Sequence, residues 1–190
     1  MYLIRGQHNL ELFKSRFKDN KLSGTICNFD GLHLGHQAIL EKIKNNSKEF
    51  NSKTIVFFTE PHASEYFASI NNLHNEIPPR ICSWREKFKL LEKSGIDFAF
   101  FLKFNNSLRT MSPENFISEI LDSINLKSFT VGDDFRFGLN RKGDTDQLRE
   151  WGKKRGILIE NTETILYEDE RVSSSRIRKA LIDNNFKLAE

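Results

Sequence analysis

Short apolar runs alternate along the chain with longer segments in which apolar residues recur every three or four positions. The runs are rich in β-branched and aromatic residues, which predicts buried strands at residues 22–29, 53–58, 98–102, 129–131 and 157–159. The longer segments predict helices after Gly35, over Trp84–Leu91, from Ser112, around Leu148 and Trp151, and after Ser173. This alternation indicates an α/β fold with a doubly wound, mostly parallel sheet and helices on both faces.

Residues that favour helix ends sit at several of these boundaries. Ser112 followed by Pro113 is a strong start signal, because serine caps a helix and proline suits the first helical position. Gly95 and Gly156 suit the position just after a helix. The polar stretch from Glu60 to Arg80 has little periodicity, and we expect it to be a loop.

The last predicted helix begins at Ser173–Ser175, a run of serines that favours a helix N-terminus. Its apolar residues are Ile177, Leu181 and Leu188. The chain shows no internal repeat, low-complexity tract or linker, so we expect one domain over residues 1–190.

Composition narrows the class of protein. A hydrophobic content of 38% with 29% charged residues is typical of a soluble globular domain and excludes a disordered chain. The net charge of +3 suits small anionic ligands, but it is too diffuse for a nucleic-acid platform. We therefore expect small-molecule substrates and no nucleic-acid partner, and nothing in the sequence fixes the oligomeric state.

Compartment is predicted from the cysteines and the N-terminus. Cys27 and Cys82 form no pattern of a disulfide framework, which favours a reducing compartment. The first residues lack the apolar stretch of a signal peptide, and apolar clusters such as Phe98–Leu102 are too short to span a membrane. The expectation is a cytoplasmic protein without a membrane partner.

Three loops follow predicted strands and carry unusual residues: 28–36, 59–62 and 132–138. In doubly wound folds, ligands bind at the carboxyl ends of the strands, near the point where the strand order reverses. We therefore expect these loops to meet around one ligand site.

The first loop ends in His33-Leu34-Gly35-His36, at a predicted strand-to-helix turn. A helix N-terminus offers free N–H groups, and imidazoles can donate to oxygens that gain charge during a reaction. A His-x-x-His metal site is the alternative, but no second His/Cys pair completes the usual four ligands. An ordinary Asx-type turn is a further alternative.

Two later segments carry complementary chemistry. Ser173–Arg178 combines hydroxyls and arginines that suit phosphate oxygens, although Ser173 could simply cap a helix with solvated arginines. Gly132–Gly138 places carboxylates beside aromatic rings and could hold Mg²⁺ or a ligand hydroxyl. The alternative for this second segment is a turn whose phenylalanines only fill the core.

Three motifs occur in order: Asn28-Phe29-Asp30-Gly31-x-His33-x-Gly35-His36, Gly132-Asp133-Asp134-Phe135-Arg136-Phe137-Gly138, and Ser173-Ser174-Ser175-x-Ile177-Arg178. The chain resembles, over nearly its whole length, the FMN adenylyltransferase module of the bacterial bifunctional riboflavin kinase/FMN adenylyltransferases, the prokaryotic FAD synthetases. The HxGH turn marks the wider nucleotidyltransferase superfamily, with a Rossmann-like fold. The NFDG and DDFRFG runs resemble its flavin branch.

The resemblance implies that a phosphate oxygen of FMN attacks the α-phosphorus of ATP, giving FAD and pyrophosphate, with Mg²⁺ accompanying ATP. It implies catalytic roles for His33, His36 and Arg178. The implied ATP-binding residues are Asn28, Phe29, Asp30, Gly31, His33, Gly35, His36, Gly132, Ser173, Ser174, Ser175 and Arg178. The implied FMN-binding residues are Thr59, Glu60, Pro61, His62, Asp134, Phe135, Arg136 and Phe137.

The chain departs from the family pattern in three respects. Cys27 stands where the family usually has glycine, and Thr59 replaces an aromatic residue near the flavin. The family continues into a riboflavin kinase domain, which needs on the order of a hundred more residues. We expect that domain to be absent here and riboflavin phosphorylation to be undetectable with this chain.

Other functions stay open. A relative of the same superfamily could adenylylate pantetheine phosphate or nicotinamide mononucleotide, although the DFRFG run favours a flavin. A class I aminoacyl-tRNA synthetase fragment also carries an HxGH-like turn, but the chain has no lysine-rich KMSKS-type loop. A nucleotide- or flavin-binding module without turnover is the alternative outside the enzymes.

Overall fold

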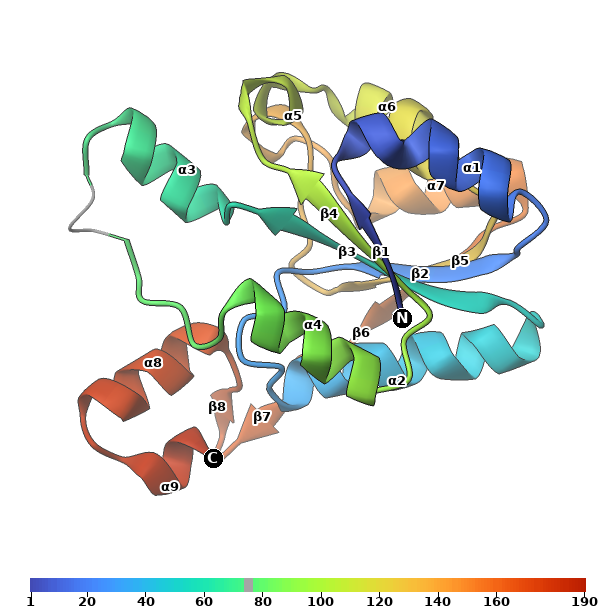
Figure 1. The fold of residues 1–190 in the computed structure, drawn as a ribbon. Helices are drawn as coiled ribbons and strands as arrows, with labels where there is room; N and C mark the ends of the chain where they lie inside the picture. The colour runs from blue at the N-terminus through green and yellow to red at the C-terminus, as the bar shows by residue number, and fades with distance from the viewer. Residues whose placement is uncertain (74–76) are drawn as a thin grey trace.

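A parallel sheet forms the centre of the computed structural model, which describes residues 1–73 and 77–190 (Figure 1). Within these residues the sheet has six strands in the order β1-β4-β3-β2-β5-β6, and every neighbouring pair is parallel. The strands are β1 (Tyr2–Arg5), β2 (Leu22–Ile26), β3 (Lys53–Glu60), β4 (Phe98–Lys103), β5 (Leu126–Gly132) and β6 (Leu158–Thr162). The α/β fold with a doubly wound parallel sheet is therefore confirmed.

The strand order places a switch point at β2. From β2 the chain continues to β3 and β4 on one side, and β5 and β6 are added on the other side. In sheets of this kind a crevice opens where successive connections leave in opposite directions, outside the carboxyl ends of the strands. The carboxyl ends of β2 and β5 are therefore the expected place for a ligand.

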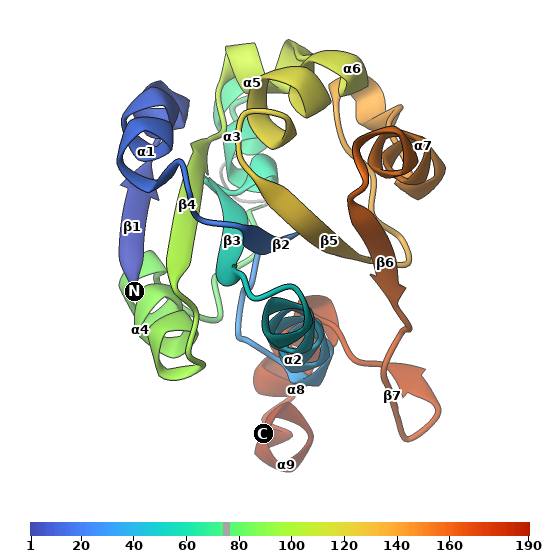
Figure 2. The same ribbon diagram turned by 90° about the vertical axis from the view of Figure 1, so that its right-hand side faces the viewer.

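Helices cover both faces of the sheet (Figure 2). The helices are α1 (Leu10–Phe17), α2 (Leu34–Glu49), α3 (Ala63–Ile70), α4 (Trp84–Lys93), α5 (Asn106–Thr110), α6 (Pro113–Phe116), α7 (Thr145–Arg155), α8 (Ser174–Ile182) and α9 (Phe186–Ala189). One core cluster joins α1, α6 and α7 to the sheet, and a second joins α2 and α4 to its opposite face.

Consecutive residues of the central strands serve different cores. Phe57 of β3 belongs to the first cluster and packs on Phe100, with ring centroids 5.3 Å apart. Phe58 belongs to the second and packs edge-on against Phe101 at 4.2 Å. Because both faces are buried, these strands read as continuous apolar runs, and that is why the sequence predicts them so clearly.

Most predicted helix boundaries are confirmed. Ser112 caps α6, accepting a hydrogen bond from the Asn115 amide at 3.1 Å, and a π-helical turn at Ile117–Leu121 follows. Gly95 and Gly156 have φ values of 79° and 66°, the left-handed conformation that ends α4 and α7.

Several elements correct the sequence-based expectation. The edge strand β1 and helices α1 and α5 were not predicted, and neither was the hairpin β7–β8 (Leu166–Tyr167 and Glu170–Arg171). The first predicted strand ends at Ile26 rather than Phe29, because Phe29 has a φ of 51° that no strand accommodates. Leu188 lies in α9, a separate short helix, and not in the last predicted helix.

The stretch Glu60–Arg80 is only partly a loop, so the prediction there is wrong over Ala63–Ile70. Helix α3 forms because His62 accepts a hydrogen bond from the Ser64 amide while Glu65 accepts one from the His62 amide at 2.9 Å. Reciprocal bonds of this kind satisfy backbone donors at a helix start. Residues 74–76 of the stretch lie outside the described residues. Among the described helices, none is long and apolar enough to cross a membrane.

Candidate active site

A cavity of about 1070 Å³ opens at the carboxyl ends of β2, β3 and β5, where the switch point predicts a ligand site. The loops after these three strands line it together with the N-terminus of α8. The sequence-predicted residues that line it are Asn28, Asp30, His33, Gly35, His36, Thr59, His62, Gly132, Asp134, Phe135, Arg136, Phe137, Ser173, Ser174, Ser175 and Arg178. The fold therefore brings the three motifs together.

The two histidines lie at the first turn of α2. His33 is the N-cap residue, and its Nδ1 accepts a hydrogen bond from the His36 amide at 3.4 Å. The two rings stack with centroids 3.7 Å apart. A Cβ at Gly35 would lie 3.3 Å from the His33 ring, so a glycine there leaves room for this ring to fold over the helix start.

Both histidines are held neutral. Burial lowers the pKa of His36 to about 3, and the nearby His33 and Lys87 add to the effect. Burial and the charge of Arg171 also lower the pKa of His33. Nδ1 of His36 has no hydrogen-bond partner in the part of the chain that the structure describes. A neutral imidazole keeps one N–H donor and one acceptor, which suits contact with phosphate oxygens.

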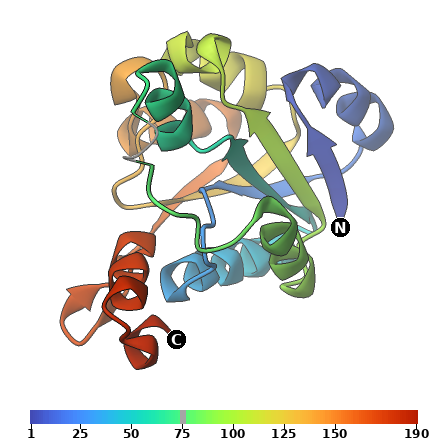
Figure 3. The ribbon, with the colours of Figure 1, turned by 60° about the vertical axis from the view of Figure 1, so that its left-hand side comes forward.

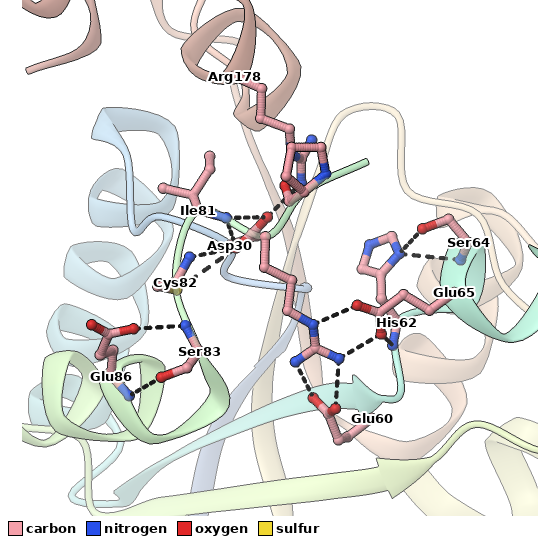
Figure 4. A network of polar contacts seen from close by, with 12 residues as sticks. Asp30, Glu60, His62, Ser64, Glu65, Ile81, Cys82, Ser83, Glu86 and Arg178 are labelled. Carbon is pink, nitrogen blue, oxygen red and sulfur yellow. Dashed lines mark hydrogen bonds and ion pairs between the residues drawn. The ribbon is translucent and has the colours of Figure 1, made fainter. Parts of the chain in front are cut away.

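Asp30 joins the turn after β2 to two distant segments (Figure 4). Its carboxylate accepts hydrogen bonds from the Ile81 and Cys82 amides, both at 3.1 Å, and from the Arg178 guanidinium. Burial alone would raise the pKa of Asp30, but the donors on Cys82, Ile81 and Arg178 together lower it below its usual range. Asp30 is therefore an ionised anchor for Arg178.

Helix α8 lies beside the start of α2 (Figure 3). The Ser174 hydroxyl donates to the Asp30 carbonyl at 2.7 Å, and Arg178 Nε donates to the Pro79 carbonyl at 2.7 Å. Ser173 is the N-cap of α8, as predicted, and accepts a hydrogen bond from the Arg176 amide at 3.2 Å. These bonds fix two helix N-termini on one side of the cavity.

A second ionic group lies next to this anchor. Arg80 binds both Glu60 and Glu65, with its Nη2 2.7 Å from Glu60 Oε1 (Figure 4). The hydrogen bond to Arg80 is the main cause that lowers the pKa of Glu65. A small cavity of about 20 Å³ separates this group from Asp30 and Arg178.

Aromatic rings form a further part of the lining of the large cavity. Phe135 and Phe137 stack with centroids 5.6 Å apart, and Phe137 packs on Phe116 at 5.4 Å. The aromatic residues that line the cavity are Phe58, Phe67, Phe104, Phe116, Phe135 and Phe137. Thr59 donates from its hydroxyl to Asn28 Oδ1 at 3.0 Å, which ties the ends of β2 and β3 together. A wall of this kind can accept a large planar ligand.

Four predicted site residues lie outside the lining of the large cavity. The Phe29 side chain is fully buried and lies beneath His36, with ring centroids 5.2 Å apart. Gly31 has a φ of 86°, and a Cβ there would meet Ile81 at 2.9 Å. Glu60 lines the smaller cavity, and Pro61 lines neither. Their contact with a ligand stays a prediction.

Sequence reasoning missed several charged residues of the site, among them Arg171, Glu65 and Lys87. Arg171 pairs with Asp134 at 2.8 Å and lines the large cavity. Glu65 and Lys87 line the small one. Glu65 could have been found, because it stands three residues after His62, the spacing of a capping box. Arg171 and Lys87 carry no local signal of that kind.

The arrangement suits an anionic ligand with a planar part. Two helix N-termini, neutral imidazoles, serine hydroxyls and Arg178 converge on one side, and such groups bind phosphates. No cluster of three or more His, Cys, Asp or Glu residues in the described part of the chain could hold a metal ion.

Comparison with known proteins agrees with this geometry. The family model described as FAD synthetase matches residues 16–176. The whole chain is 37% identical to the bifunctional riboflavin kinase/FMN adenylyltransferase of Escherichia coli K12 and covers 58% of that relative. It is 36% identical to the protein of the same description from Buchnera aphidicola of Schizaphis graminum, again covering 58% of it, and 34% identical to the one from Haemophilus influenzae, covering 59%.

A solved structure has the same fold. The crystal structure described as a macrolide-efflux protein from Streptococcus pneumoniae superposes with a TM-score of 0.82 at 21% sequence identity. The match covers 100% of this chain and 60% of that one. At this identity the likeness shows the fold alone.

Proposed function

The chain belongs to the FAD synthetase family, and we propose that it transfers the adenylyl group of ATP to the phosphate of FMN. A phosphate oxygen of FMN attacks the α-phosphorus of ATP, and the bond from that phosphorus to the oxygen bridging to the β-phosphate breaks. FAD and pyrophosphate result, with no covalent intermediate on the protein. The chain spans about 58% of the length of its E. coli relative, so the activity of this chain is a proposal and is not taken over from the whole relative.

The observation that carries the proposal is the meeting of two helix N-termini with an aromatic wall in one cavity of about 1070 Å³. Transfer between phosphates depends mainly on positioning and on donors to oxygens that gain charge. His33 and His36 would donate to the α-phosphate and bridging oxygens. Ser175, Arg178 and the backbone amide of Ser174, whose hydroxyl already donates to the Asp30 carbonyl, would hold the departing phosphates.

The flavin would lie against the aromatic part of the lining. Phe135, Phe137 and the end of β3 at Thr59 face the same space as the histidines. Thr59 is too small to stack on a flavin, so the aromatic rings that line the cavity must supply most of the apolar contact. His62 borders the cavity on this side, and burial lowers its pKa, which favours its neutral form.

Mg²⁺ fits this site as a companion of ATP rather than as a resident of a protein cage. The described residues offer no cluster of three ligands, and Mg²⁺ commonly binds through substrate phosphates with one or two carboxylates. When bound, it would neutralise charge on the triphosphate. The free cysteines Cys27 and Cys82 are compatible with our proposal of a reducing, cytoplasmic setting.

The test is to incubate the chain with ATP, FMN and Mg²⁺ and to separate the flavins by chromatography. We expect FAD and an equal amount of pyrophosphate. Reactions with riboflavin, pantetheine phosphate or nicotinamide mononucleotide in place of FMN are the matched controls. Adenylylation of one of these in preference to FMN would reassign the acceptor, and binding of ATP and FMN without FAD would contradict the proposed enzyme.

A further inference from the structure

Lys87 of α4 is a buried charged residue without a role in the proposed transfer. Its exposed fraction is 5%, and its ammonium lies 5.0 Å from the centroid of the Phe58 ring. Within residues 1–73 and 77–190 the ammonium makes no hydrogen bond and no ion pair. The contact with the Phe58 ring offsets part of the cost of burying this charge, but the ring is neutral, so a carboxylate nearby would stabilise the ammonium further.

The surroundings of Lys87 supply one. Lys87 lines the cavity of about 20 Å³ together with Asp30, Glu60, Arg80 and Arg178. A space of that size holds about one water molecule between polar groups. Burial lowers the pKa of Lys87, while the opposite charges of Glu60 and Asp30 work against that effect. The ammonium therefore faces carboxylates across a small polar gap.

The other cations of this cavity are already engaged. Arg80 binds two carboxylates, Glu60 and Glu65. Arg178 binds Asp30 and the Pro79 carbonyl. Among the described residues that line the small cavity, Lys87 is the cation without a direct carboxylate partner.

Binding of a triphosphate changes this balance. Arg178 has five N–H donors, so it can contact a phosphate while it still holds Asp30. Its single positive charge is then shared between a phosphate and a carboxylate that is nearly buried. Without a second cation nearby, the binding of the anion would be weakened by Asp30.

We propose that Lys87 is a positioning residue that supplies the counter-charge for Asp30 when Arg178 engages the phosphates of ATP. Lys87 contacts neither substrate and acts through the small cavity behind Asp30. This role rests on the proposed binding of ATP at the α8 N-terminus. It also explains why α4 carries a charge on the side that faces the sheet.

The test is a double-mutant cycle on the full chain, measured by calorimetric titration with ATP and Mg²⁺ in the absence of FMN. Lys87→Met, which keeps the length of the side chain, should weaken ATP binding about tenfold, the effect of one unit charge about 12 Å from another at an effective dielectric constant of about 20. In the Asp30→Asn background the same substitution should weaken ATP binding less than about threefold. In that background the positive charge of Arg178 is no longer shared between a phosphate and the carboxylate of Asp30. Lys89→Met, an exposed lysine on the same helix, should leave ATP binding unchanged.

Thermal unfolding separates this role from a structural one. Removing a buried charge in favour of an apolar group should leave the melting temperature of Lys87→Met unchanged or raise it. Unchanged ATP affinity in Lys87→Met, or an equal loss with and without Asp30→Asn, would overturn the role of Lys87. If Lys87→Met does not fold, Lys87→Gln is measured in the same cycle with the same criteria.

Failure of the proposed function gives a different result. An unsubstituted chain that binds ATP but forms no FAD with FMN contradicts the transfer, and the binding cycle still decides the role of Lys87. An unsubstituted chain that does not bind ATP overturns both.

Discussion

His36 should make the folded protein sensitive to mild acid. Burial lowers its pKa to about 3, whereas an unfolded histidine titrates near pH 6.5. The fold therefore favours the neutral form, and the stability that His36 contributes is present above pH 6.5. As the pH falls through the window from about 6.5 to about 3, the unfolded chain takes up a proton that the folded chain refuses, and stability is lost.

The size of this loss follows from the width of the window. At pH 5 the solution lies about 1.5 pH units below the pKa of the unfolded histidine and still above that of the folded one. At about 1.4 kcal/mol per unit, His36 accounts for about 2 kcal/mol of the free energy of unfolding lost between pH 7 and pH 5. The pKa values of His33 and His62 are also lowered by burial, so the whole protein should lose more than this.

The assay is urea unfolding at pH 7 and pH 5 for the unsubstituted protein and for His36→Gln. The difference in unfolding free energy between the two pH values should be about 2 kcal/mol smaller in His36→Gln, because glutamine does not titrate. His8→Gln, which replaces an exposed histidine, should behave as the unsubstituted protein does. An acid loss of the same size in His36→Gln would refute the claim that the fold holds His36 neutral.

Three further substitutions test the site. His36→Ala should reduce FAD formation about 10²-fold with an intact far-UV circular dichroism spectrum, as loss of an oxyanion donor does, and full activity would contradict its role. Arg178→Ala should raise the KM for ATP more than the KM for FMN in steady-state assays, whereas equal rises would indicate a structural arginine. Gly31→Ala should destabilise the fold by about 1–3 kcal/mol in chemical unfolding, because its φ is 86° and a Cβ would lie 2.9 Å from Ile81. An unchanged unfolding midpoint would show that the Gly31 turn adapts.

The sequence predicts the central strands β3 and β4 well because they are buried on both faces. Each run of apolar residues from β2 to β6 serves one of the two cores or both. The edge strand β1 escapes prediction because it is four residues long and Ile4 is its one buried residue. Helix α3 escapes for a different reason: its N-cap is His62, a residue that statistics for helix caps do not favour.

The site divides in the same way between local and long-range signals. The HxGH turn and the serine cap of α8 are readable from the chain because each satisfies its own helix N-terminus. The pair Asp30–Arg178 joins positions 148 residues apart, and Arg80 reaches Glu60 and Glu65 from the segment before α4. Such pairs depend on how the layers pack, and spacing along the sequence carries no information about them.

Asp30 shows what a motif alone leaves undecided. Asp30 stands in the same motif as His33 and His36, and the motif therefore suggests that Asp30 contacts ATP. In the structure its carboxylate already accepts bonds from Ile81, Cys82 and Arg178, which leaves few lone pairs for a ligand. Its geometry therefore favours holding Arg178 and the segment before α4 in place over binding the nucleotide itself. A motif conveys spacing, and spacing is the same for a residue that touches a ligand and for one that holds its neighbours in position.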